Sequence, residues 1–230
     1  MPVEPPPCPW AWPDPRTADE HDVVGMGADL EPGTLLSAYR AGLFPMPVGR
    51  RRLAWFSPDP RGVLPMAGLH ISRSLRRSRR RFDVSVDTAF REVMLGCARG
   101  RDDGDWITDA IVDAYCALHE LGWAHSVEVW ADGELAGGLY GVAVGGLFAG
   151  ESMFHRVTDA SKVAMVEAAR LVARGGGVLF DVQWSTPHLA SMGVVEISRD
   201  EYLARLPDAL ARPEIDWEEG PRSPGWGAAR

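Results

Sequence analysis

An acid and an amide at the end of a short apolar run, Asp181 and Gln183, are the residues best placed to take part in a reaction. The run over residues 178–182 predicts a buried strand, and strand alternation puts both polar side chains on one face, with Val182 on the other. Burying either group without a hydrogen-bond partner would cost roughly 1–3 kcal/mol. Two interpretations stay open: a carboxylate that orients the amide or accepts a proton from an attacking amine, and a structural network that ties the strand to its neighbours.

Two further positions suggest ligand binding. Glu151 lies in the polar tract 150–154, before a predicted helix that starts near Asp159, and ligands often meet an open sheet at such a junction. The alternative is that Glu151 caps a backbone or pairs with Arg156. Trp106 follows the polar loop 101–105, and an exposed tryptophan stacks on nucleobases for about 1–3 kcal/mol per base. Most tryptophans, however, are core residues.

Six arginines and no acid fall within residues 73–81. The whole chain has a net charge of −8, but local charge decides whether a protein binds phosphates. Such a block is either a solvated face or a surface that contacts a nucleic-acid backbone. The positions that we take as candidate contacts to such a backbone are Arg73, Arg76, Arg77 and Arg80.

No metal and no cofactor is expected. The six histidines are scattered and the three cysteines lack metal-ligand spacing. There is no nucleotide-binding loop, and the glycines at 175–177 follow a predicted helix, so their amides point away from any anion. Few cysteines, no signal peptide and no apolar run of roughly 20 residues predict a cytoplasmic protein without membrane contact, which we expect to be a monomer.

Apolar spacing predicts the order of elements from about residue 86 onward as two helices, three strands, a helix, a strand and a helix. Residues 30–41 read as a short helix, residues 73–81 as a basic helix, and residues 55–65, with three prolines, as an irregular loop. This pattern is typical of an α+β fold with a mixed central sheet. We expect a small N-terminal lobe over residues 1–68, a catalytic domain over 69–212 and a loose tail over 213–230.

Several motifs occur in an order and at a spacing that coincidence does not explain. They are GMGADL at 25–30, YRAGLFP at 39–45, WFSPDPR at 55–61, SRSLR at 72–76, AHSVEVW at 124–130, GGLYG at 137–141, GESMF at 150–154, DVQ at 181–183 and HLASMG at 188–193. With them the chain resembles the leucyl/phenylalanyl-tRNA–protein transferase family over roughly residues 9–206. The resemblance implies a GNAT-like acyltransferase domain that works without acyl-CoA. It also implies transfer of Leu, Phe or Met from aminoacyl-tRNA to proteins that begin with Arg or Lys, which marks them for degradation in the N-degron pathway.

The resemblance also assigns roles to individual positions, and it makes the candidate backbone contacts Arg73, Arg76, Arg77 and Arg80 contacts to the acceptor stem of the tRNA. Asp181 polarises Gln183 to assist the attacking α-amine, Glu151 holds the acceptor or the aminoacyl amine, and Trp106 contacts the terminal adenosine with Tyr115 beside it. Tyr39 belongs to the same substrate-binding set, as does Met46, which stands where many relatives have a tryptophan after Phe-Pro. The residues at or near positions that line the pocket for the aminoacyl side chain are Leu139, Phe148, Met153, Met165 and Phe180.

Two other functions remain open from the sequence. An ordinary N-acyltransferase would bind CoA tightly, although the loop for its pyrophosphate is missing. A non-catalytic RNA-binding module would use the arginines and exposed tryptophans, and it would keep all its function if Asp181 were replaced.

Overall fold

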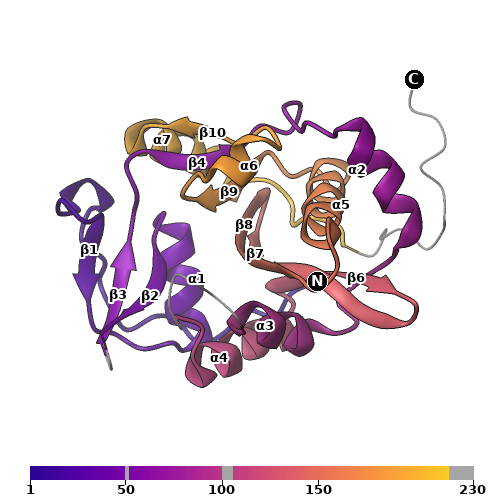
Figure 1. The fold of residues 1–230 in the computed structure, drawn as a ribbon. Coiled ribbons are helices and arrows are strands. Elements are labelled where there is room, and N and C mark those ends of the chain that lie inside the picture. The colour runs from indigo at the N-terminus through magenta and orange to yellow at the C-terminus, as the bar shows by residue number, and fades with distance from the viewer. Residues whose placement is uncertain (50–51, 100–105, 218–230) are drawn as a thin grey trace.

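The computed structural model describes residues 1–49, 52–99 and 106–217, and the described chain folds into two sheets with helices around them (Figure 1). The element order predicted from residue 86 onward is confirmed. The loop predicted at 101–105 and the tail from residue 218 lie outside the described residues. The larger sheet is mixed, which confirms the α+β class.

The smaller sheet belongs to the N-terminal part of the chain and has the order β1-β3-β2, all antiparallel. Its neighbouring helix α1 carries buried Leu35, Leu36 and Tyr39 into the core that it shares with the larger domain. The elements are the 3-10 turn η1 (Pro15–Thr17), β1 (Val23–Met26), α1 (Pro32–Arg40), β2 (Phe44–Val48) and β3 (Arg52–Phe56).

The larger sheet has seven strands in the order β10-β4-β9-β8-β7-β6-β5, and only β8 and β9 among them pair in parallel. The strands are β4 (Arg61–Leu64), β5 (Asp83–Val86), β6 (Ala124–Ala131), β7 (Glu134–Val144), β8 (Leu147–His155), β9 (Leu179–Gln183) and β10 (Val195–Ile197).

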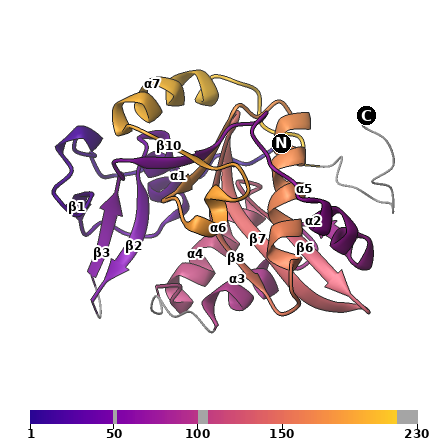
Figure 2. The same ribbon diagram turned by 45° about the horizontal axis from the view of Figure 1, so that its top comes forward.

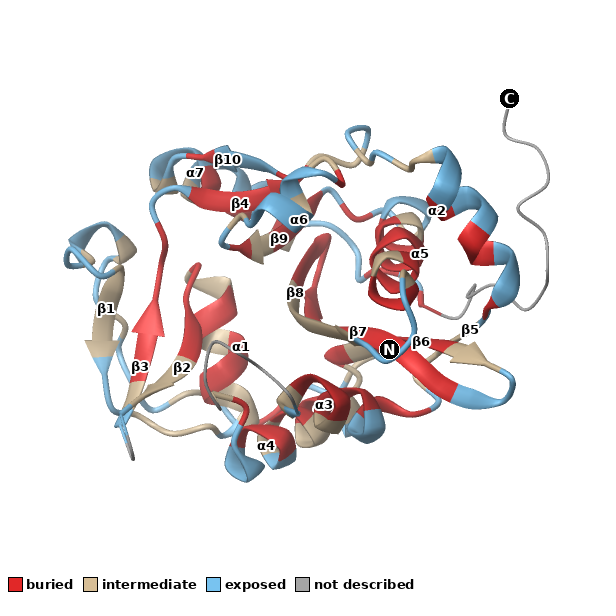
Figure 3. Ribbon diagram, in the orientation of Figure 1, coloured by how far each residue is buried: buried red, intermediate tan, exposed pale blue. Residues whose placement is uncertain are grey.

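Helices cover both faces of this sheet (Figure 2). Helix α5 packs on one face of β6, β7 and β8, and α3 packs on the other with α4 beside it. The helices are α2 (Arg73–Ser78) with the 3-10 turn η2 (Arg79–Arg81), α3 (Phe90–Ala98), α4 (Asp109–Glu120), α5 (Ala160–Arg174), α6 (Pro187–Ala190) and α7 (Arg199–Leu210). The buried hydrophobic residues form three clusters, and the red segments of Figure 3 mark buried residues in strands of both sheets and in the helices around them.

The parallel pair β8–β9 separates after three paired residues, and this separation creates the site described below. Pairing begins at Leu147↔Leu179 and ends at Ala149↔Asp181, although β8 continues to His155. Each strand has a bulge just beyond that point. In β8 the ladder with β7 skips Glu151, and in β9 the ladder with β4 skips Val182. Bulges re-aim side chains and are common beside active sites.

Two expectations about the fold were wrong. Residues 55–65 are not one irregular loop, because they include the end of β3 and the whole of β4, and the prolines at 58, 60 and 65 fall outside these strands. The start of the expected loose tail is anchored to the core by two residues, since Ile215 and Trp217 are buried and Trp217 stacks on His125 at 4.4 Å between ring centroids. The division at residue 68 stays a prediction, although β4 pairs within the larger sheet.

Among the described residues, no helix combines the length and the apolar character that crossing a bilayer requires.

Close backbone approach at Gly141 gives a test of the packing between β7 and β8. A Cβ on Gly141 would stand 2.3 Å from the carbonyl oxygen of Ala149 and 2.6 Å from the ring of Phe148. Gly141→Ala therefore forces the strands apart, and we expect it to lower the free energy of unfolding by roughly 1–3 kcal/mol in urea titrations. Gly25→Ala is the control, because its nearest neighbour is Cγ of Pro13 at 4.0 Å. Equal losses in the two variants would contradict the tight approach.

Candidate active site

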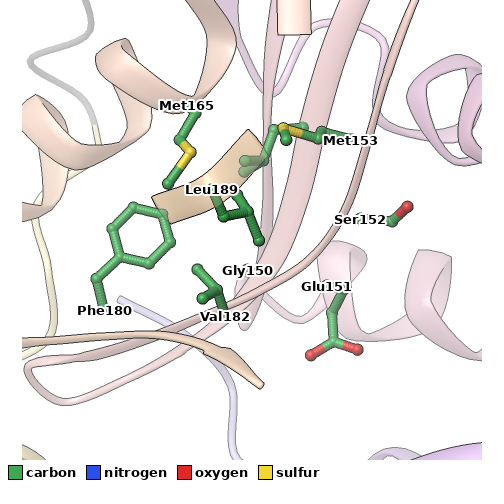
Figure 4. Close-up of a pocket in the computed structure, with 9 residues that line it drawn as sticks. Gly150, Glu151, Ser152, Met153, Met165, Phe180, Val182 and Leu189 are labelled. Carbon is green, nitrogen blue, oxygen red and sulfur yellow. The ribbon is translucent and has the colours of Figure 1, made fainter. Parts of the chain in front are cut away.

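An apolar cavity lies in the gap between the separated strands β8 and β9. It encloses ≈ 370 Å³ of empty space, including the part that is open to solvent. Figure 4 shows Phe180 and Val182 from β9 and Met165 from α5 pointing into this space, whereas the carboxylate of Glu151 points away from these apolar side chains. The lining residues are Leu139, Gly150, Glu151, Ser152, Met153, Met165, Phe180, Val182 and Leu189.

The amide of Gln183 joins the two strands at the edge of this cavity. Its hydrogen bonds are satisfied when the side-chain nitrogen donates to the carbonyl oxygens of Gly150, at 2.9 Å, and Val182, at 3.1 Å. The other terminal atom of the amide, which is then the oxygen, lies 3.4 Å from Oε1 of Glu151. Two oxygens attract each other only if one carries a proton, so this arrangement favours a protonated Glu151.

The pKa of Glu151 agrees with that arrangement. Burial, and secondarily the charge of Asp181, raise the pKa of Glu151 to about 8, against hydrogen bonds from Tyr39 and Tyr115 and the positive charge of Arg61. A carboxyl group with this pKa changes its charge near neutral pH, which suits it to proton transfer.

Two buried tyrosines stand behind Glu151. The hydroxyl groups of Tyr39 and Tyr115 lie 2.5 Å apart, and that of Tyr115 donates to Oε2 of Glu151 at 3.3 Å. Burial, together with the nearby charge of Glu151, raises the pKa of both tyrosines well above its usual value. Both hydroxyls therefore stay protonated, and the structure brings together three of the residues expected to bind substrate.

Asp181 does not reach the cavity, because it is fully buried on the other side of β9 with Arg61 (0% and 1% exposed). Its Oδ1 accepts from Nε of Arg61 at 2.8 Å and from the backbone N–H of Gln183 at 2.9 Å. Its Oδ2 accepts from Nη2 of Arg61 at 2.6 Å and from the hydroxyl of Tyr202 at 3.2 Å. Burial opposes the charged form of Arg61, but the charge of Asp181, its hydrogen bond and the nearby Tyr202 and Glu151 together raise the pKa of Arg61.

Asp181 acts on the backbone of Gln183 in the structure, so the expectation that it polarises the side chain of Gln183 needs correction. Gln183 has φ = 60°, in the left-handed region that non-glycine residues rarely adopt. The hydrogen bond from its N–H to Asp181 stabilises that conformation, and the conformation breaks the strand alternation that we used to predict one shared face. Asp181 is thus a positioning residue for the amide.

The remaining predicted pocket residues are distributed unevenly. Four of the five line the cavity, but Phe148 lies behind it, fully buried with its ring centroid 4.9 Å from that of Phe180. Trp106 and Met46 are half-buried and pack against the cluster that contains Tyr39 and Tyr115. Glu151 was expected in a loop, but it lies within β8 as the bulge residue.

The four predicted tRNA contacts, Arg73, Arg76, Arg77 and Arg80, are all exposed on α2 and η2. Helix α2 lies beside α5 at the end of the molecule opposite the small sheet (Figure 1). The described residues contain no group of three or more His, Cys, Asp or Glu side chains arranged to hold a metal ion.

Comparisons with known proteins match nearly the whole chain to one family. The family model described as leucyl/phenylalanyl-tRNA protein transferase matches residues 63–207, and that for the N-terminal domain of the same transferase matches residues 28–59. The chain belongs to the leucyl/phenylalanyl-tRNA–protein transferase family. It is therefore an aminoacyltransferase by family membership.

Curated members of the family are similar along most of their length. The leucyl/phenylalanyl-tRNA–protein transferase of Syntrophobacter fumaroxidans is 50% identical over 210 residues, which cover 87% of this chain and 89% of that protein. The protein of the same name from Anaeromyxobacter sp. strain K is 47% identical over 221 residues, with 93% and 95% covered.

Two of the solved structures that align with this chain share little sequence with it. A GCN5-related N-acetyltransferase from Kribbella flavida aligns with a TM-score of 0.40 at 12% identity, over 73% of this chain and 61% of that one. The C-terminal domain of a putative lysylphosphatidylglycerol synthetase from Agrobacterium fabrum also has a TM-score of 0.40 at 12% identity, over 79% and 60%.

Sequence reasoning gave no role to several residues that shape the site. Arg61 lies in the quoted motif WFSPDPR, and a lone arginine opening an apolar strand was the available signal for a buried ion pair. Tyr202, Val182 and Leu189 carried no such signal. Trp184, directly after Gln183, is 38% exposed and contacts Phe44 edge-on at 5.1 Å between ring centroids, so it places an aromatic surface next to the amide.

Removing one partner of the buried ion pair tests its contribution. Arg61→Met leaves the carboxylate of Asp181 buried without its countercharge, and we expect the free energy of unfolding to fall by about 3–5 kcal/mol in denaturant titrations. Arg91→Met, which breaks an exposed pair with Asp113, should change little. The double change Arg61→Met with Asp181→Leu should recover part of the loss. Similar stabilities for the Arg61 and Arg91 variants would refute the assigned role.

The raised pKa of Glu151 predicts a pH-dependent effect on stability. Between its usual pKa of 4.5 and about 8, the unfolded chain releases the proton while the folded chain keeps it, so this group's contribution to stability falls as pH rises. Glu151→Gln removes that fall. Measured between pH 5 and 8, the variant should gain stability relative to the parent by up to about 1.4 kcal/mol per pH unit. Glu196→Gln, at an exposed position, is the matched substitution, and the same trend in both variants would contradict the prediction.

Proposed function

We propose that this chain transfers Leu, Phe or Met from aminoacyl-tRNA to the N-terminal Arg or Lys of acceptor proteins, which marks them for degradation. The observation that carries the proposal is the apolar cavity at the separation of β8 and β9, with Glu151 and Gln183 at its edge. Family membership supports the reaction class, because the relatives are named for tRNA-dependent transfer.

The cavity supports the choice of amino acid. Its walls carry two methionines, a leucine pair, a valine and Phe180, with no charged side chain except Glu151. Unbranched, flexible Met165 and Met153 adapt to Leu, Phe or Met, whereas a β-branched side chain presents its bulk next to the ester. A hydrophobic pocket separates such side chains by about 10- to 200-fold.

The reaction is aminolysis of an ester and needs no other energy source. The α-amine of the acceptor attacks the ester carbonyl carbon, a C–N bond forms, the C–O bond to the terminal ribose breaks, and the ribose hydroxyl leaves with a proton. Ionised Glu151 accepts the proton of the attacking amine and passes it to the departing ribose oxygen, and its pKa of about 8 matches that of an α-amine of about 7.7–8. The amide of Gln183 orients the reacting groups.

Asp181 and Arg61 do not touch the reacting groups; they contribute to this reaction by positioning Gln183. Their ion pair holds the backbone of Gln183, and the tyrosine pair holds Glu151 from the other side. Accurate placement of reacting groups is itself a large part of catalysis, since misplacement by about 1 Å can lower a rate by 100-fold.

Transfer of labelled leucine from Leu-tRNA to a peptide beginning with Arg tests the proposal. We expect label on this peptide and none on a matched peptide that begins with Ala, and at least about tenfold slower transfer from Ile-tRNA. Glu151→Gln should lose transfer while it still binds tRNA. Label on both peptides would refute the acceptor assignment. Full activity of Glu151→Gln would contradict the role of the carboxyl, and tRNA binding with no transfer by the parent would favour an RNA-binding module.

A further inference from the structure

The basic segment on α2 and η2 contacts a second helix, and the sequence gives no sign of this contact. The guanidinium of Arg79 is buried, and its Nε donates to Oε1 of Glu167 on α5 at 2.8 Å while Nη1 donates to the carbonyl of Phe82 at 2.7 Å. Arg79 is 8% and Glu167 4% exposed. This contact therefore connects α2–η2 to α5 and sets how the two helices face each other.

Helix α5 adds its own cationic residues next to that contact. Glu167 is the only acid in the sequence of α5, and Arg170 and Arg174 follow it by about one and two turns. Burial, with repulsion from Arg76, Arg79 and Arg174, lowers the pKa of Arg170 against the opposing attraction of Glu167. Guanidinium groups from both helices therefore lie close enough to repel one another, and an anion bound between them relieves that repulsion.

We propose that α2–η2 and the C-terminal half of α5 form one binding surface for the phosphate backbone of the tRNA acceptor end, with Arg170 and Arg174 as phosphate contacts beside Arg76. This inference rests on the proposed function. Arg79 is not a phosphate contact but the residue that positions the two helices. The exposed members of the surface are Arg73, Arg76, Arg77, Arg80 and Arg174, and Arg170 is half-buried.

The position of α5 explains why the ligand is the end of a tRNA. The same helix carries Met165 into the cavity, and Arg170 and Arg174 lie roughly 8 and 14 Å farther along its axis. An aminoacyl group in the cavity and the phosphates that precede it therefore contact different sides of the same helix, because about 100° per residue turns Arg170 and Arg174 away from Met165. The chain's net charge of −8 opposes binding of polyanions elsewhere, so a local basic surface decides where RNA lies.

The salt dependence of the affinity for tRNA reports the number of phosphate contacts, and measuring it provides the test. Each contact contributes about 0.7–0.9 to the slope of log K against log salt concentration. The double variant Arg170→Gln with Arg174→Gln should therefore bind Leu-tRNA with a slope smaller by about 1.4–1.8, and at least about tenfold more weakly near 0.1 M salt. Arg174→Gln alone, a change at an exposed position, should reduce the slope by about 0.7–0.9, which is half of the decrease expected for the double variant.

The matched control changes the same charge on another surface. Arg205 is exposed on α7 and Arg212 is exposed two residues after its end, and each pairs with an acid four residues earlier. Helices α7 and α2 lie on different sides of the molecule (Figure 1). Arg205→Gln with Arg212→Gln should keep the parental slope and affinity. Thermal unfolding of each variant checks that the fold is intact.

The outcomes separate this inference from the proposed function. If the parent transfers leucine and the α5 variant keeps the parental slope, the surface is overturned while the proposed function stands. An equal fall in slope in the α7 control would also overturn it, because net charge alone would then explain the effect. If the parent neither transfers leucine nor binds Leu-tRNA, the proposed function fails first.

Discussion

One buried ion pair fixes the geometry on which the site depends. Arg61 opens β4 and Asp181 lies in the neighbouring strand β9, and neither side chain meets solvent. Breaking such a pair is costly because the remaining charge has no water around it. The guanidinium lies over the rings of Tyr202 and Phe44, at 4.3 and 5.0 Å, so α7 and the small sheet join the same contact. Asp181 in turn holds the N–H of Gln183, which links this rigid centre to the edge of the cavity.

The two carboxylates of the site differ because their surroundings differ. Asp181 has a guanidinium against it, whereas Glu151 is buried without such a partner, and this burial raises its pKa although the hydroxyl groups of Tyr39 and Tyr115 oppose the shift. The same chemical group therefore has two roles in two environments: the carboxyl group of Asp181 is part of a structural ion pair, and that of Glu151 titrates near neutral pH. The separation of β8 and β9 makes this possible, because it turns one carboxylate toward the cavity edge and leaves the other behind the sheet.

The sequence predicted most of the catalytic domain because its helices have clear periodicity and its hairpins have glycine turns. It failed where proline conceals strands. Pro45 and Pro47 lie in β2, an edge strand of the small sheet. Proline is tolerated there because its missing N–H removes no hydrogen bond from the interior of a sheet. At the site, residue types pointed to Asp181, Gln183 and Glu151, but their relations depend on distant partners. Arg61 is 120 residues from Asp181, and the bulges at Glu151 and Val182 arise from how strands pair, which no local pattern records.

The two bulge residues have a consequence for how such enzymes diversify. Because neither Glu151 nor Val182 has a partner across its ladder, either can be exchanged without shifting strand register. Met165 and Leu189 reach the same cavity from separate helices, so pocket volume and edge chemistry can vary independently. A library that randomises Val182, Met165 and Leu189 and keeps Glu151 would explore new amino-acid substrates on an unchanged scaffold.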